Sequence, residues 1–235
     1  MEKLKFYPAK IEILEKVLKS GERKVFNFLN LYSVYLFKKN KNFREAIINN
    51  QENNINFIDG SIPAIYLKAR KIRGTDFTRF FLKNVQDAKS TKHFFLGFEK
   101  KDIELFREKF YGIKKAKLFA YNPPYIKGEK FSEEEIDKIC WLIDKSEIAW
   151  VGLGNPKQEI LAQEIYNRTN VQFIFCVGAA LDFLTGKKKE APKVLRKLKI
   201  EWLYRGLIDF KYSGNKVLKS FIGLFYLPKS VVLVK

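Results

Sequence analysis

Short apolar runs alternate with amphipathic stretches along most of the chain. Six runs of five to eight residues predict strands at residues 25–30, 55–59, 93–98, 117–121, 148–153 and 171–178. The stretches between them predict helices at residues 33–49, 61–70, 75–88 and 99–110, from the N-cap Ser132 to Lys145, and directly after Pro156. Runs that are almost wholly apolar are typical of parallel strands covered on both faces. The alternation therefore predicts an α/β, Rossmann-like fold with a mostly parallel sheet flanked by helices.

The alternation stops near Gly186, where a basic segment begins. Residues 217–234 mix apolar side chains with Lys219 and Lys229, and they are too interrupted to span a bilayer. Their composition suits a helix that lies in a membrane interface, although a helix docked on the protein's own core is the alternative. We therefore predict an α/β domain at residues 1–186 and a basic, apolar helical appendage at residues 187–235 that binds membranes.

Net charge changes this picture, because the 235 residues carry a formal charge of +19. Residues 187–235 hold 13 Lys and Arg against three Asp and Glu, so more than half of the excess lies in this segment. Such a patch attracts nucleic acid, an anionic membrane or pyrophosphate ligands, unless it is only a solvated surface. A basic nucleic-acid-binding α/β protein therefore stays open as a function, although no recognition helix, RNP-like strand or zinc finger supports it.

Other features of the composition narrow the class of protein. An apolar fraction of 46% with 22 Phe residues excludes general disorder. Cys140 and Cys176 lie in apolar segments, which favours two buried, reduced thiols in a cytoplasmic protein. The single histidine, His93, gives no support to a zinc site or a Ser-His-Asp triad. The first residues lack the apolar core of a signal peptide, so we do not expect export.

Candidate ligand residues follow the predicted strands, because ligands of parallel sheets bind beyond the carboxyl ends of the strands. These positions are Asn30, Asp59–Gly60, Gly97, Tyr121–Asn122, Gly152 and Gly154 with Gln158, and Gly178 with Asp182. Polar side chains and glycines that gather at one edge of a sheet indicate a binding site there.

The stretch WVGLGNPKQE, residues 150–159, reads as a strand, a turn and the start of a helix. A dinucleotide fingerprint needs a third glycine, which is absent after Gly154, and the pattern of a Walker loop is absent as well. What remains is a turn that presents amides at a helix N-terminus, which suits a phosphate or a polar ring. A tight connection with no ligand is the alternative.

Asp59 follows a predicted strand in the sequence FIDGS and is either a turn residue or a general base facing a cleft. Asn30 ends the neighbouring predicted strand and could orient a hydroxyl group. No second carboxylate pairs convincingly with Asp59, which argues against a glycoside hydrolase, and no D-x-D pair follows a strand to hold a metal.

A third block, CVGAALDFLTGKKKEAPKVLRKLKIEWLYR, covers residues 176–205. Together and in this order, the three blocks resemble the WecG/TagA/CpsF family of bacterial glycosyltransferases across roughly residues 24–212. The early block is Phe28–Asn30 with Asp59–Gly60, and the middle block is Val151–Glu159.

The resemblance implies transfer of an N-acetylmannosamine-type sugar from a UDP donor to a polyprenyl-diphosphate-linked amino sugar during synthesis of a cell-surface polysaccharide. It further implies an inverting, metal-independent enzyme without a cofactor, peripheral on the inner, cytoplasmic face of the plasma membrane. Homo-oligomers are expected, and a nucleic-acid partner is not.

The same resemblance assigns roles to individual residues. It makes Asp59 the catalytic base and Asn30 the residue that orients acceptor or donor. The substrate-binding residues that it implies are Lys71, Arg73, Gly97, Tyr121, Asn122, Gly152, Gly154, Gln158, Glu159, Asp182 and Arg205.

The chain also departs from the family pattern. Phe28 stands where the family has threonine, the segment between Gly60 and Gly74 is shorter, and Lys71 replaces an arginine. The sequence AYNPPY replaces a glycine-rich turn. A member of the family that has lost its activity is therefore a third reading of the sequence.

Overall fold

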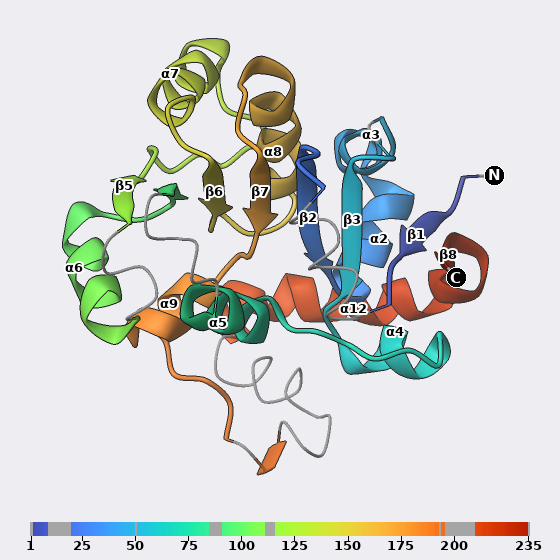
Figure 1. Ribbon diagram of the computed structural model, residues 1–235. Coiled ribbons are helices and arrows are strands. Elements are labelled where there is room, and N and C mark those ends of the chain that lie inside the picture. Colours follow the sequence, from blue (N-terminus) through green and yellow to red (C-terminus); the bar gives the residue numbers. More distant parts are fainter. Residues whose placement is uncertain are drawn as a thin grey trace.

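A parallel sheet forms the centre of the molecule (Figure 1). The computed structural model describes residues 2–8, 20–49, 51–84, 91–110, 116–192, 194–195 and 210–234. Six of the described strands pair in parallel in the order β3-β2-β7-β6-β4-β5. They are β2 (Lys24–Leu29), β3 (Asn54–Ile58), β4 (Lys92–Leu96), β5 (Lys117–Tyr121), β6 (Ile148–Val151) and β7 (Phe173–Cys176). Each lies within two residues of a predicted strand, which confirms the α/β prediction.

Helices cover both faces of this sheet. The described helices before the C-terminal one are α2 (Leu31–Lys39), α3 (Lys41–Ile48), α4 (Ser61–Tyr66), α5 (Gly74–Asn84), α6 (Lys100–Lys109), α7 (Glu133–Ile143), α8 (Lys157–Arg168) and α9 (Ala180–Thr185). Apolar residues of α5, α6 and α9 pack on one face, and those of α7 and α8 pack on the other. Successive strand residues point to opposite faces, so Val25 and Phe26 belong to different halves of the core.

Phenylalanine fills the half of the core that lies beneath α5. The ring centroid of Phe28 lies 5.0 Å from that of Phe77 and 5.8 Å from that of Phe57. Phe28 is 4% exposed, and a Cβ atom on Gly74 would lie 3.5 Å from its ring. Phe28, where the resemblance leads us to expect threonine, is therefore part of the packing beneath the turn that opens α5.

The helix predicted at residues 33–49 is wrong in one respect, because two helices occupy this region. Asn40 has extended backbone angles and lies between α2 and α3. Its side-chain oxygen accepts a hydrogen bond from the Phe43 N–H at 2.8 Å and so caps α3. Asparagine favours such caps because its short side chain replaces a missing helical hydrogen bond.

The two ends of the described chain meet at one side of the molecule (Figure 1). Strand β1 (Leu4–Phe6) pairs in parallel with β8 (Val231–Leu233), which follows the helix α12 (Phe210–Ser230). Neither short strand was predicted from the sequence. The helical character of the C-terminal segment is confirmed, and no helix within the described ranges is long and apolar enough to cross a membrane.

Helix α12 is docked on α2 beyond the carboxyl ends of the strands (Figure 1). Gly223 marks the closest approach, because a Cβ atom there would overlap the carbonyl oxygen of Leu31. Leu227 is 1% exposed in a core cluster that also contains residues of β1, α2 and α3. The alternative of a helix docked on the protein's own core thus describes this contact, while membrane binding and the division at residue 187 stay predictions.

Gly223→Ala should push α12 away from α2. Alanine normally stabilises a helix interior relative to glycine, but the added methyl group overlaps backbone atoms that cannot rotate away. We expect the free energy of unfolding to fall by roughly 1–3 kcal/mol in urea titrations. The control is Asn215→Ala, at an exposed position of the same helix, and equal stability of the two variants would contradict the close contact.

Candidate functional site

The residues that follow the strands gather at one edge of the sheet. All six strands run in parallel, so their carboxyl ends point the same way, toward α4, α9 and α12 (Figure 1). The edge contains Asn30 after β2, Asp59 after β3, Gly97 after β4, Tyr121 at the end of β5, Gly152 after β6 and Gly178 after β7. The predicted clustering of these backbone positions therefore holds.

Asn30 and Asp59 lie side by side at the ends of adjacent strands. A Cβ atom on Gly60 would lie 3.5 Å from the Cβ of Asn30, and the Asp59 N–H donates to the Leu29 carbonyl oxygen at 2.8 Å. The Asn30 side-chain oxygen caps α2 by accepting from the N–H groups of Tyr32 and Ser33 at 3.0 and 3.3 Å. These bonds fix the Asn30 side chain at the end of β2. At the end of the neighbouring strand, the half-buried Asp59 carboxylate accepts from the Gly74 N–H at 3.4 Å.

The two predicted cations near Asp59 differ in their surroundings. Arg73 is 8% exposed and donates two hydrogen bonds of 2.7 Å to Asp76, with a further one of 3.1 Å to Glu190. The ion pairs of Arg73 therefore connect Asp76 of α5 to Glu190 in the segment after α9. Lys71 Nζ donates to the neutral Ser61 hydroxyl at 3.0 Å. Of the two, Lys71 is better placed to offer its charge to an anionic ligand.

Glycines allow three neighbouring turns to pack backbone against backbone. A Cβ atom on Gly152 would lie 3.3 Å from the Gly178 carbonyl oxygen and 3.4 Å from that of Leu96. Gly97 has φ +91° and also touches the backbone of Gly152. We call residues 152–155 the glycine loop; it is half-buried and lies directly before Pro156, the N-cap of α8.

Gln158 and Glu159 lie beneath the glycine loop, with exposed fractions of 2% and 1%. The Gln158 Oε1 accepts from the Gly154 N–H at 3.1 Å, and its Nε2 donates to Glu159 Oε1 at 2.8 Å. Asn155 Nδ2 donates to the same carboxylate oxygen at 2.6 Å and to Ser33 Oγ at 3.3 Å. Asn155 therefore links the glycine loop to the helix capped by Asn30, and the Glu159 carboxyl group holds the Asn155 side chain.

Burial raises the pKa of Glu159 to about 7, although the hydrogen bond from Gln158 and the charge of Lys216 oppose this. Glu159 Oε2 has no hydrogen-bond partner among the described residues. Desolvation lowers the pKa of Lys216. The charge of Glu159 opposes this shift, and the charges of Lys157 and Lys188 add to it. A charged residue of α12 therefore interacts with Glu159 in the site.

The remaining predicted residues have partners of their own or lie apart. The Tyr121 hydroxyl donates a hydrogen bond to Glu135 at 2.7 Å, so this hydroxyl already has a partner within the protein. Asn122 is exposed. Asp182 forms an ion pair of 2.8 Å with Lys188. Arg205 lies outside the described residues.

The single histidine belongs to the core. His93 is fully buried, and its Nδ1 accepts from the Trp150 indole N–H at 3.1 Å. Burial lowers the pKa of His93 to about 4, so it is neutral at physiological pH. Among the residues that the structure describes, no group of three or more His, Cys, Asp or Glu side chains is placed to hold a metal ion.

Sequence reasoning missed Ser33, Asn155 and Lys216. The hydrogen bond from Asn155 to Ser33 connects the glycine loop to α2. Of the three, only Ser33 could have been noticed in the sequence, because it stands three residues after the cap Asn30. Lys216 and Lys219 lie over the rings of Tyr32 and Tyr35 at 5.6 and 5.8 Å. The matching spacing of three residues in each helix is visible in the sequence, but pairing the two helices needs the fold.

Glu159→Gln should remove a loss of stability that wild type shows as pH rises. The folded pKa of about 7 exceeds the ordinary value of 4.5, so the folded state binds more protons between these values and loses stability as pH rises through them. Relative to wild type, we expect the variant to gain about 2–3 kcal/mol in free energy of unfolding between pH 5 and pH 8. Urea titrations at both pH values measure this difference. Glu134→Gln, at an exposed position on α7, is the control, and parallel pH profiles of wild type and Glu159→Gln would contradict the titration.

Known proteins match this chain over part of its length. An N-acetylglucosaminyldiphosphoundecaprenol N-acetyl-beta-D-mannosaminyltransferase of Staphylococcus aureus (strain MRSA252) is 40% identical over 97 residues, which are 41% of this chain and 37% of that protein. A protein of the same name from strain NCTC 8325 / PS 47 is 39% identical over the same shares of both chains. The aligned segment thus spans little more than a third of these relatives.

A family match extends much further along the chain. The model described as "Glycosyl transferase WecG/TagA/CpsF family" matches residues 3–229. This range includes the ends of all six sheet strands, the glycine loop and most of α12. The chain belongs to the WecG/TagA/CpsF family of glycosyl transferases.

Proposed function

We propose that the chain transfers an N-acetylmannosamine-type sugar from a UDP donor to a hydroxyl of a polyprenyl-diphosphate-linked amino sugar. The product would enter a cell-surface polysaccharide. The observation that carries this proposal is the placement of Asp59 and Asn30 at the same sheet edge as the glycine loop. Membership of the family and the names of the Staphylococcus aureus relatives support the reaction and the substrate class.

In this reaction the acceptor hydroxyl oxygen attacks the anomeric carbon of the donor sugar. The bond from that carbon to the UDP oxygen breaks, UDP leaves with the bonding electrons, and the configuration inverts. Asp59 takes the hydroxyl proton as the general base. Asn30, held by the cap of α2, is placed to orient the acceptor or the donor next to that carboxylate.

Glu159 is the competing carboxylate, because a pKa of about 7 suits a general base. Its accessibility argues against this role, since the side chain is 1% exposed and accepts from two structural amides. Asp59 is half-buried and lies at the end of its strand. We therefore assign proton removal to Asp59 and support of the glycine loop to Glu159.

The departing UDP needs stabilisation of its negative charge. The glycine loop leads into α8, a helix of 12 residues, and helix N-termini favour anions. Lys157 and Lys188 are close enough to Lys216 to lower its pKa, after the larger effect of desolvation, so positive charge gathers near this loop. Arg205 would add a charge-assisted contact, each such contact being worth about 1.5–3 kcal/mol.

Asp59→Asn tests the proposed base. With UDP-N-acetylmannosamine and a synthetic prenyl-diphosphate-linked N-acetylglucosamine, we expect UDP release to fall by about 10²–10⁴-fold, the usual contribution of a general base. The matched control is Asp144→Asn, at the C-terminus of α7 and remote from the carboxyl ends of the strands. Full activity of Asp59→Asn would exclude this carboxylate as the base, and no turnover of wild type with any UDP-N-acetylhexosamine would favour a decayed family member.

We also propose that the docked α12 binds an anionic membrane from the cytoplasmic side, where the proposed nucleotide-sugar donor is found. Its outward surface exposes large apolar side chains between lysines. The exposed members are Leu218, Phe221, Ile222 and Phe225. Apolar insertion together with attraction of lysines to anionic lipids is the usual basis of such interfacial binding. Self-association, which the family resemblance implies, stays a prediction.

Phe225→Ser tests the membrane contact. Phe225 is 78% exposed, so its removal leaves the packing of α12 on α2 intact while deleting the most exposed apolar group of this surface. We expect about tenfold weaker partitioning onto vesicles of anionic lipid in a sedimentation assay. Trp141→Ser is the control, because Trp141 is 71% exposed on α7 and remote from α12. Equal losses in both variants would contradict binding through α12.

A further inference from the structure

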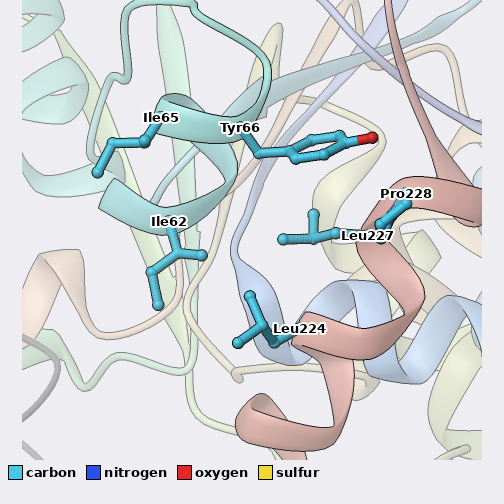
Figure 2. A pocket seen from close by; sticks show the side chains of 6 residues that line it. All are labelled: Ile62, Ile65, Tyr66, Leu224, Leu227 and Pro228. Carbon is cyan, nitrogen blue, oxygen red and sulfur yellow. The ribbon is translucent and has the colours of Figure 1, made fainter.

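An open, apolar groove of about 300 Å³ lies between α4 and the C-terminal half of α12. Figure 2 shows side chains of the two helices that face one another across it. The lining residues are Ile62, Ile65, Tyr66, Leu224, Leu227 and Pro228. Ile65 is 61% exposed and Leu227 only 1%, so the groove leads from the surface to the core. An exposed, contiguous apolar surface of this kind usually marks a binding site.

The groove begins close to the proposed catalytic base. Helix α4 starts at Ser61, directly after Asp59 and Gly60, and its six residues span about 9 Å. Lys71 Nζ is bound to the Ser61 hydroxyl, and the following residue, Ile72, donates its N–H to the Ile58 carbonyl oxygen at 2.9 Å. A cation is therefore held where α4 begins, at Ser61, which stands in the chain between Asp59 and the first lining residue, Ile62.

We propose that this groove binds the first isoprene units of the acceptor lipid, with the acceptor diphosphate at Lys71. The inference rests on the proposed function and extends it to a subsite for the lipid. An acceptor of this class carries its groups in a fixed order, which is a sugar hydroxyl, a diphosphate and then a prenyl chain. The protein presents a base at Asp59, a cation at Lys71 and an apolar groove in the same order along α4.

The shape of α12 favours a single chain over a flat membrane surface as the occupant of the groove. Leu224 lines the groove, whereas Phe225 lies about 100° farther around the helix and does not. The outward face can contact a bilayer while the groove face stays available. A lipid surface cannot reach Leu227 without separating the helices, but a narrow prenyl chain can lie against the accessible wall above it.

The experiment uses soluble acceptors in the absence of vesicles and detergent. One acceptor carries two isoprene units on N-acetylglucosamine diphosphate, and the other carries a methyl group in their place. Wild type should prefer the prenyl acceptor in kcat/KM, and Ile65→Ser should reduce this preference about tenfold. An unchanged preference in Ile65→Ser overturns the proposal.

Two further variants locate the effect. Trp141→Ser removes an apolar side chain that is more exposed than Ile65 and far from the groove, and it should keep the wild-type preference. Phe225→Ser changes the outward face of α12 and should keep it as well in this vesicle-free assay. If Phe225→Ser reduces the preference as much as Ile65→Ser does, the prenyl chain binds non-specifically to exposed apolar side chains. The groove assignment is then wrong.

A binding measurement separates failure of this inference from failure of the proposed function. Farnesyl diphosphate is titrated into wild type and Ile65→Ser by calorimetry, with inorganic diphosphate as the chain-free probe. We expect about tenfold weaker binding of farnesyl diphosphate to the variant and no such difference for diphosphate. If wild type shows no turnover but the variant binds only farnesyl diphosphate more weakly, the proposed transferase activity is refuted and the groove assignment stands. Equal affinities for farnesyl diphosphate would refute the groove, whatever the turnover.

Discussion

Parallel pairing of the six strands is the constraint on which the site depends. It directs every carboxyl end to one edge of the sheet, where neighbouring chains must turn away within a few residues. At Gly97, Gly152 and Gly178 these turns touch backbone to backbone, and a side chain on Gly152 would press on two carbonyl oxygens. The glycines of WVGLGNPKQE therefore satisfy the packing of the fold first. The half-buried turn before α8, which we propose to face the donor phosphates, follows from that packing.

The Asn155 side chain connects the glycine loop to α2, and a buried carboxyl group holds that side chain. Glu159 Oε1 receives hydrogen bonds from Asn155 and Gln158, while its Oε2 has no hydrogen-bond partner in the described part of the chain. Burial of an incompletely paired carboxyl opposes folding, and the raised pKa of Glu159 is the consequence. In return, the geometry of the glycine loop is fixed relative to the helix that Asn30 caps. Such local conflicts with stability are expected at functional sites.

The sequence predicts features that depend on local pattern and misses those that depend on distant packing. The strands and the positions after them could be predicted because apolar runs end abruptly in polar residues or glycine, as at Asp59. The interruption at Asn40 was missed because asparagine is tolerated within helices, and the short strands β1 and β8 are too brief to show a period. A polar residue after a strand also looks the same whether it faces a ligand or supports a loop. Gln158, which only the family resemblance makes a substrate-binding residue, is buried in the structure, so that role stays a prediction.

Contact between α12 and α2 bears on how the protein could meet a membrane. Eight residues, about 12 Å of helix, separate Lys216 near Glu159 from Leu224 in the groove. One docked helix therefore holds both parts of the site in register. Lifting α12 onto a bilayer would expose Leu227 and Val231 and break the pairing of β8 with β1. Each such side chain stabilises the docked state by about 1.5–3 kcal/mol, so membrane contact through the outward face of the docked helix is the less costly arrangement.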